Sequence, residues 1–302
     1  FFNSGQALKG MLDSILNGSL VPDEILLIDD GSTDDSVELA KSYALNHPNI
    51  HYFRQDHAGV SAARNLGLEN ASGHWISFLD ADDYIERGMY ESMISSLDDD
   101  SLSGCVAGYF THKNGIVTSY VGDYPNGFNS QELLKAMFCA DNVRGFLVNK
   151  LFLASLIKDE RFATGIGHCE DLLFITKILV GNPDLKFAYA KESVYHYIQS
   201  DSSATGSLKY FENGIFIYKP AFDKILKLVK KDFVVNHYEE ILEYSMYMLL
   251  AAYRAGDLDV KSQIRLLQKE LKSINPSKFS KRRWFYIHCP ILFSLLRPDK
   301  FL

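Results

Sequence analysis

Apolar residues recur along the first two hundred positions at spacings typical of helices and of strands in turn. The pattern predicts helices at 6–17, 34–46 and 60–70, and strands at 24–29, 50–54 and 75–79. Strands that alternate with helices indicate an α/β fold with a mostly parallel central sheet. Ligands of such sheets bind beyond the carboxyl ends of the strands.

The pattern changes near residue 205. Helical spacing dominates the segments 208–229, 233–255 and 259–274, and no strand-like run interrupts them. The sequence therefore predicts an α/β body at residues 1–204 and a helical C-terminal region at residues 205–302.

Composition supports a folded protein of two parts. The chain has 302 residues, of which 47% are hydrophobic, so it can bury a large core and exceeds the usual size of one domain. Its apolar runs are too short to cross a bilayer, and its first residues lack the basic start and long apolar stretch of a signal peptide. Its four cysteines lie far apart without a C-x-x-C pair, which favours free thiols. Together these features predict a cytoplasmic protein.

Charge is distributed unevenly along the chain. Residues 1–204 carry 14 basic against 28 acidic side chains, whereas residues 205–302 carry 17 against 10. An acidic body excludes a nucleic-acid enzyme, because binding to phosphates needs clustered basic residues.

The basic residues of the C-terminal region gather beside an apolar run. Lys278, Lys281, Arg282 and Arg283 precede the apolar segment 284–287. Such a run can lie on an anionic membrane at the inner face, near a lipid-linked acceptor. The alternative is a terminal helix packed on its own domain with a solvated basic edge.

Two predicted strands end in acidic residues, Asp29-Asp30 and Asp80-Ala81-Asp82-Asp83. A D-x-D at a strand end offers two hard oxygen ligands, which suit Mg²⁺ or Mn²⁺ on a diphosphate. Alone, the tripeptide also fits an ordinary surface loop. A calcium loop is excluded because Ile85 stands where glycine is needed, and the glycine-rich dinucleotide loop and the P-loop are absent.

Five segments in order carry a specific resemblance. They are Phe2-Asn3-Ser4, Asp29-Asp30-Gly31-Ser32-Thr33-Asp34, Ala63-Arg64-Asn65-Leu66-Gly67, Asp80-Ala81-Asp82-Asp83 and Glu170-Asp171. Over about residues 1 to 200 the chain resembles family 2 of the inverting glycosyltransferases, which have the GT-A fold. Residues 1–204 would then be a GT-A catalytic domain.

The resemblance implies a donor site at the first two acidic residues. Asp30 would recognise the uracil ring, with Asp29 supporting the site. Phe2 and Asn3 stand in place of the family's Tyr-Asn pair and count as donor-binding residues. Arg64 would lie near the base or the diphosphate. A carboxylate can accept the imide N–H of uracil, so the chemistry is compatible.

The resemblance also implies metal and catalytic residues. Asp80 would contact the ribose and Asp82 the metal, while Asp171 would be the catalytic base. Glu170 would act beside Asp171, orient it, or cap the helix that begins there. His196 has two readings, a group that completes a Mn²⁺ site or a strand residue that points to solvent.

The sequence departs from the family pattern at several points. Gln199 stands where the family often has arginine, which puts a diphosphate contact in doubt. The family's first strand lies before residue 1, so the native chain is expected to begin earlier. The segment Asn149-Lys150-Leu151-Phe152 also resembles the family without an assigned role, and Lys150 is expected at the surface.

These observations lead to one main hypothesis and two alternatives. The main one is a Mn²⁺- or Mg²⁺-dependent inverting hexosyltransferase that uses a UDP-sugar in surface polysaccharide or glycoprotein glycan synthesis. Its acceptor would be a glycan, a glycoprotein or a lipid-linked molecule. A sugar-nucleotide pyrophosphorylase would need a glycine-rich phosphate loop near the N-terminus, and none is present. A catalytically silent glycan-binding or partner subunit that kept the fold is the other alternative.

Overall fold

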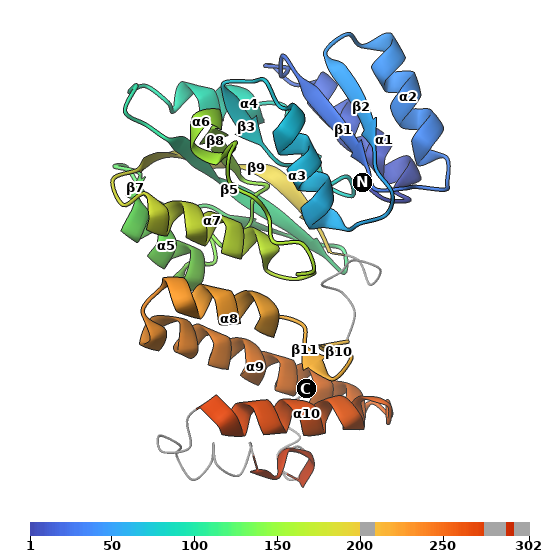
Figure 1. Ribbon diagram of the computed structural model, residues 1–302, viewed down its shortest axis with the longest axis vertical. Helices are drawn as coiled ribbons and strands as arrows, with labels where there is room; N and C mark the ends of the chain where they lie inside the picture. Colours follow the sequence, from blue (N-terminus) through green and yellow to red (C-terminus); the bar gives the residue numbers. More distant parts are fainter. Residues whose placement is uncertain (200–208, 275–287, 293–302) are drawn as a thin grey trace. The chain divides into compact units, whose positions relative to one another are not determined.

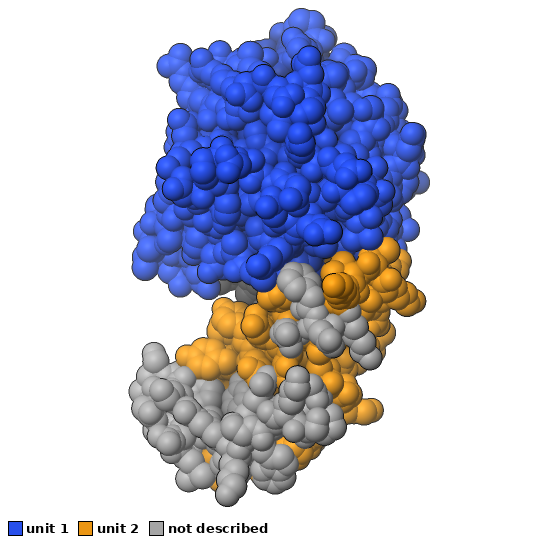
Figure 2. All heavy atoms as spheres, turned by 90° about the vertical axis from the view of Figure 1, so that its left-hand side faces the viewer, with its two compact units in different colours: residues 1–200 blue, residues 201–302 orange. Residues whose placement is uncertain are grey.

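The computed structural model describes residues 1–199, 209–274 and 288–292. The chain divides into two compact units, residues 1–200 and residues 201–302, which Figure 2 colours separately. None of the helices within these described ranges is long and apolar enough to cross a membrane.

All six elements expected in the first eighty residues form, with ends that shift by two residues at most. They are α1 (Gly5–Leu16), β1 (Ile25–Asp29), α2 (Ser36–Asn46), β2 (Ile50–Arg54), α3 (Val60–Asn70) and β3 (Trp75–Ser77) (Figure 1). The local hydrophobic period therefore decides the type of each element in this part of the chain.

The rest of the first unit adds most of the central sheet. Its elements are β4 (Tyr84–Ile85), α4 (Met89–Ser95), β5 (Gly104–Lys113), β6 (Ile116–Tyr120), β7 (Phe128–Asn129), α5 (Ser130–Cys139), β8 (Lys150–Leu153), α6 (Ala154–Ile157), α7 (Glu170–Gly181) and β9 (Lys186–Ile198). Strands of this seven-stranded sheet follow the order β3-β8-β5-β9-β4, with β6 beside β5 and β7 beside β9, while β1 and β2 pair with each other in a separate two-stranded sheet. The pairs β1–β2 and β5–β9 are parallel, and the other pairs in this unit are antiparallel. The expected α/β class is confirmed, with a sheet that mixes both strand directions.

Helices cover both faces of the sheet. One apolar core joins the sheet to α1, α2 and α4, and a second core joins it to α5 and α7. Successive residues of β5 alternate between the cores, since Cys105 belongs to the first and Val106 to the second. The layers hold the strand ends rigidly, which is what a binding site at those ends requires.

The described residues of the second unit form a hairpin and three helices. Its elements are β10 (Phe211–Glu212), β11 (Ile215–Phe216), α8 (Lys219–Leu228), α9 (Lys231–Arg254) and α10 (Val260–Ile274). The expectation of an uninterrupted helix at 208–229 was wrong. Asn213 and Gly214 both have positive φ, 49° and 77°, which makes the tight turn that an Asn-Gly pair favours between two strands. The basic run at 278–283 and the segment 284–287 lie outside the described residues.

Gly104, the first residue of β5, provides a test of how closely the sheet is packed. A Cβ on Gly104 would lie 2.2 Å from the Leu151 carbonyl oxygen, whereas a Cβ on Gly10, inside α1, would meet no atom within 4 Å. We expect Gly104→Ala to lower the free energy of unfolding by about 1–3 kcal/mol. Gly10→Ala, the matched control, should raise it by about 0.5–1 kcal/mol. Urea unfolding measures both changes, and a Gly104→Ala protein as stable as the parent would contradict this packing.

Candidate active site

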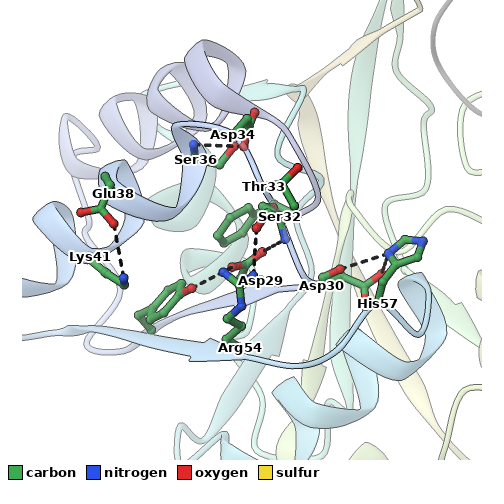
Figure 3. A network of polar contacts seen from close by, with 12 residues as sticks. Asp29, Asp30, Ser32, Thr33, Asp34, Ser36, Glu38, Lys41, Arg54 and His57 are labelled. Atoms are coloured by element: carbon green, nitrogen blue, oxygen red, sulfur yellow. Dashed lines mark hydrogen bonds and ion pairs between the residues drawn. The ribbon is translucent and has the colours of Figure 1, made fainter.

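Asp29 is the last residue of β1, and it is completely buried. Its carboxylate accepts hydrogen bonds from the Ser32 amide at 2.8 Å, the Tyr52 hydroxyl at 2.7 Å and the Arg54 guanidinium at 3.0 Å (Figure 3). Burial opposes the charged form, but the donors around the carboxylate outweigh it and lower the pKa of Asp29. Asp29 therefore stays ionised and folds the turn that follows β1.

Asp30 is also buried, and its carboxylate accepts three hydrogen bonds and lies beside the His57 ring. Oδ1 accepts from the Gln55 side chain at 2.7 Å and the Ala58 amide at 2.8 Å, and Oδ2 accepts from the Gly59 amide at 2.9 Å. The Nδ1 atom of His57 lies 3.0 Å from Oδ2, and this side chain is 61% exposed. Burial opposes ionisation, yet the amide donors outweigh it and lower the pKa of Asp30. A ligand that bonds to this carboxylate can most easily displace the exposed His57 ring.

Phe2 and Asn3 lie against the same turn. The Asn3 amide donates to Ser32 Oγ at 2.9 Å, and the Thr33 amide donates to Asn3 Oδ1 at 2.8 Å. The Phe2 ring lies 4.3 Å from the His57 ring, between centroids, and Phe2 is 44% exposed. An exposed aromatic face beside a buried carboxylate suits a planar base that both stacks and donates a hydrogen bond.

The loop after β3 carries three acidic residues in different surroundings. Asp83 is buried and accepts from the Tyr195 hydroxyl at 2.5 Å and the Ile198 amide at 2.7 Å. The same hydroxyl accepts from the Asp80 amide at 3.3 Å. Burial raises the pKa of Asp83 to about 8. Asp83 and Tyr195 therefore anchor the loop, and Asp82 is left exposed at its tip.

Arg64 of α3 connects this loop to α7. Its Nη2 donates to Asp80 Oδ1 at 3.1 Å, and its Nη1 donates to Glu170 Oε1 at 2.6 Å. The guanidinium side chain is only 13% exposed and lies 5.6 Å from the centre of the Phe162 ring. Charge-assisted contacts to two acids in one mostly buried place fix the distance between the loop and the helix.

Asp171 stands at the start of α7, directly after Glu170. Cys169, the residue before Glu170, has a φ of 58°, a left-handed conformation that costs a residue with a side chain about 1–2 kcal/mol. Asp171 Oδ1 accepts from the Leu172 amide at 2.7 Å. Burial and the charge of Glu170 raise the pKa of Asp171 to about 7, although Arg64 acts in the opposite direction. A carboxyl with this pKa can take up a proton near neutral pH.

The acidic residues of the two strand ends meet around Phe1. The backbone nitrogen of Phe1 is close enough to Asp29, Asp30 and Asp80 for all three carboxylates to act on it. It also lies near Asp82. The turn after β1 and the loop after β3 thus belong to one acidic site.

His196 lies apart from this site. Its Nε2 is 2.8 Å from the Glu86 carboxylate, and its Nδ1 is 2.8 Å from Nε2 of His112. Adjacent residues of a strand point to opposite faces, and Tyr195 is the one that faces the acidic loop. This geometry does not support a metal site shared by His196 and Asp82.

Asp82 and Asp80 fit a hard divalent cation in part. Desolvation by the surrounding protein and the charge of Asp80 raise the pKa of Asp82, so positive charge is in deficit there. Across the described parts of the chain, no group of three or more His, Cys, Asp or Glu side chains is placed to hold an ion. Asp82 would therefore hold a Mg²⁺ or Mn²⁺ ion together with water and phosphate oxygens, as Mg²⁺ commonly requires.

Comparison with known proteins identifies the family. Residues 1–146 match the family model described as Glycosyl transferase family 2. The chain is a family 2 glycosyltransferase. It is 27% identical to the uncharacterized glycosyltransferase YibD of Escherichia coli strain K12 over 270 residues, which span 84% of this chain and 75% of YibD.

A further relative and a solved structure extend the comparison. The glycosyltransferase is 28% identical to the minor teichoic acid biosynthesis protein GgaB of Bacillus subtilis strain 168 over 265 residues, 82% of this chain but only 27% of GgaB. The crystal structure of Staphylococcus aureus TarS residues 1–349 with UDP-GlcNAc matches with a TM-score of 0.65 at 17% identity, over 99% of this chain and 86% of that one. This likeness confirms the expected GT-A fold.

Some residues of the glycosyltransferase site were not predicted. Asp83 and Tyr195 anchor the acidic loop, yet the sequence signals them only as one more acid in a D-A-D-D run and as one position of an alternating strand. The donors Gln55 and His57 come from the segment after β2, where no pattern marks them. Lys150 was expected at the surface, and this was wrong, because its side chain is fully buried.

The donors to Asp30 predict how stability of the glycosyltransferase depends on pH. Asp30→Asn replaces one carboxylate oxygen with an NH2 group, so an amide that donated to that oxygen loses its acceptor, which should cost about 1–3 kcal/mol at pH 7. Because the folded pKa is lowered, this stabilisation is present above the unfolded value of about 3.9 and is lost as the pH falls through the folded pKa.

The difference between parent and variant should therefore shrink below about pH 4. Denaturant unfolding without nucleotide at several pH values measures it, with the exposed Asp56→Asn as control. A difference that stays constant from pH 7 to pH 3 would rule out the ionised Asp30 as its source.

Proposed function

We propose that this glycosyltransferase moves a sugar from a UDP-sugar to an acceptor hydroxyl with inversion of configuration. The observation that carries the proposal is the Arg64 bridge, which holds the strand-end acid Asp80 and the helix-end pair Glu170-Asp171 in one site. The Asp80 end of such a site suits a nucleotide diphosphate, and the Asp171 end offers a general base.

Donor recognition is assigned to the turn after β1. The uracil ring would stack on Phe2 and donate its imide N–H to Asp30, replacing the His57 contact. Asn3 and Asp29 shape the turn through their bonds to its backbone amides. The likeness to TarS, whose structure contains UDP-GlcNAc, supports a uridine nucleotide.

Asp80 and Asp82 are assigned to the ribose and the metal end of the donor. A bound Mn²⁺ or Mg²⁺ would supply positive charge that stabilises the leaving diphosphate. Asp83 and Tyr195 keep the loop in place, because both are buried and bonded to each other. Arg64 adds a fixed positive charge beside Asp80.

Asp171 is assigned as the general base. It takes the proton from the acceptor hydroxyl while the acceptor oxygen forms a bond to the anomeric carbon and the bond from that carbon to the UDP oxygen breaks. A single displacement of this kind inverts the anomeric centre. Glu170 is engaged by Arg64 at 2.6 Å, so we assign it to positioning Asp171 and not to proton transfer.

The acceptor is assigned to a surface glycan, a glycoprotein or a lipid-linked molecule. The 28% identity to GgaB, a teichoic acid biosynthesis protein, supports a cell-surface polymer. No disulfide links the cysteines within the described residues, which is compatible with a reducing cytoplasmic location. The proposed membrane contact rests on the basic run at 278–283, outside the described residues. A silent glycan-binding or partner subunit remains the competing hypothesis.

Asp82→Asn tests the metal assignment. It removes the charge of an exposed loop-tip acid, so we expect metal-dependent UDP binding to weaken by about 10-fold or more while the melting temperature stays unchanged. Calorimetric titration of UDP with and without Mn²⁺ measures the effect. Asp98→Asn, also exposed, serves as the control. Unchanged Mn²⁺-dependent UDP affinity in Asp82→Asn would refute the assignment.

Asp171→Asn separates chemistry from binding. Removing the base should lower kcat by about 10²- to 10⁴-fold and change the affinity for the UDP-sugar little. Asp30→Ala should instead raise the KM for the donor, and the exposed Asp159→Asn should change neither quantity. Near-normal transfer by Asp171→Asn, or a loss of donor binding as severe as that of Asp30→Ala, would move the search for the base to Glu170.

A further inference from the structure

Lys150 is a buried cation that the proposed reaction does not use. It begins β8, and its side chain has no exposed surface. Its Nζ donates to the backbone carbonyls of Val143 at 3.2 Å, Arg144 at 2.9 Å and Phe146 at 2.7 Å, and Asn149 Oδ1 lies 3.0 Å away. The ammonium group therefore gathers three carbonyls of one short turn.

Burying the ammonium group of Lys150 costs free energy, and the oxygen acceptors around it offset that cost. Desolvation lowers the pKa of Lys150 to about 7, whereas the charge of Asp171 acts in the opposite direction. The oxygen acceptors around Nζ also favour the ammonium form, because a neutral amine would face them with fewer protons than they can accept. A buried charge persists only where such partners compensate it.

The turn is tied to the central sheet on its other side. Asn149 Nδ2 donates to the Ala107 carbonyl of β5 at 2.7 Å, and the Ala107 amide donates to the Asn149 carbonyl at 3.0 Å. The hydroxyl of Tyr109, also on β5, donates to the Asp141 carbonyl. Lys150 therefore connects a rigid strand to the turn at 143–146.

The turn at 143–146 packs against the first turn of α7. A Cβ on Gly145 would lie 2.5 Å from Cδ1 of Leu172 and 3.0 Å from its Cβ, so only glycine fits against this leucine. Leu172 follows Asp171 directly, and its amide donates to Asp171 Oδ1 at 2.7 Å. Any movement of the turn would thus reach the carboxylate of Asp171 through one side chain.

We propose that Lys150 is a positioning residue of the transfer reaction, which holds the turn at 143–146 against Leu172 and so fixes the carboxylate of Asp171. The inference rests on the proposed role of Asp171 as the base. Geometry is the main contribution of Lys150, since misplacing a catalytic group by about 1 Å can cost about 100-fold in rate. Its positive charge is a second contribution, because it favours the ionised form of Asp171.

Several charged or titratable groups face Asp171 and set its ionisation together. The charges of Glu170 and Asp80 oppose ionisation, and that of Arg64 favours it. The thiol of Cys169 is held neutral by burial and by the charges of Asp171 and Glu170, which raise its pKa. Removing the charge of Lys150 should therefore raise the pKa of Asp171 further and move the acid limb of the rate profile to higher pH.

Two variants separate geometry from charge. Lys150→Met removes the charge and the bonds to the turn, so kcat should fall about 10- to 100-fold with donor KM unchanged, and the acid limb of kcat should move to higher pH. Gly145→Ala should push Leu172 and lower kcat with the acid limb unmoved, since no charge changes. Lys177→Met is the matched control. Lys177 lies on α7, as Asp171 does, but pairs with Glu160, so its removal should change neither kcat nor the acid limb.

The experiment uses the full chain, with turnover of the UDP-sugar measured by UDP release between pH 5 and pH 9. Near-UV circular dichroism and UDP binding first establish that each variant is folded. A folded Lys150→Met protein with parental kcat and pH profile would overturn the inference. If Lys150→Met does not fold, Gly145→Ala decides, and parental kcat in that variant would overturn it. Activity retained by Asp171→Asn would instead overturn the proposed function itself.

Discussion

The candidate active site brings several carboxylates close together, and their mutual repulsion must be balanced by a positive charge. Asp80 and Glu170 come from distant parts of the chain, and Arg64 contacts them at 3.1 Å and 2.6 Å. The side chains of Arg64 and Glu170 are both mostly buried, and leaving one charge of such a pair without its partner typically costs about 3–5 kcal/mol. Arg64 therefore fixes the loop after β3 relative to the start of α7. The proposed donor end and the proposed acceptor end of the site are held in one geometry by these contacts, which reduces what must be ordered on binding.

The remaining acids divide between structural and chemical work according to their donors. Asp29 accepts three hydrogen bonds and shapes a turn, and Asp83 is buried against Tyr195. The pKa of Asp83 is raised to about 8, but both oxygens of its carboxylate accept hydrogen bonds, from Tyr195 and Ile198. The pKa values of Asp82 and Asp171 are raised too, to about 7 for Asp171, whose Oδ1 accepts from the Leu172 amide. Carboxylates left in deficit of positive charge are the ones best suited to bind a cation or take a proton. The proposed metal ligand and the proposed base are these two residues.

The sequence predicted the first six elements well, because each has a local apolar period and its own turn signals. It did not predict the hairpin at Asn213-Gly214, where the turn residues outweigh a helical spacing. The acids of the site follow from the resemblance, since they stand in compact motifs. Contacts across the fold do not, because the carbonyls around Lys150 and the bond from Tyr195 to Asp83 depend on packing of distant segments.

The central claim is that this acidic site transfers a sugar from a uridine nucleotide. The most direct measurement is UDP release from a panel of UDP-sugars with Mn²⁺, with and without surface-glycan acceptors, followed by NMR of the anomeric linkage in the product. The account predicts turnover with at least one donor, strongly increased by acceptor, and a β-linked product from an α-linked donor. Tight UDP binding without turnover of any donor would contradict it and favour a silent subunit that kept the fold.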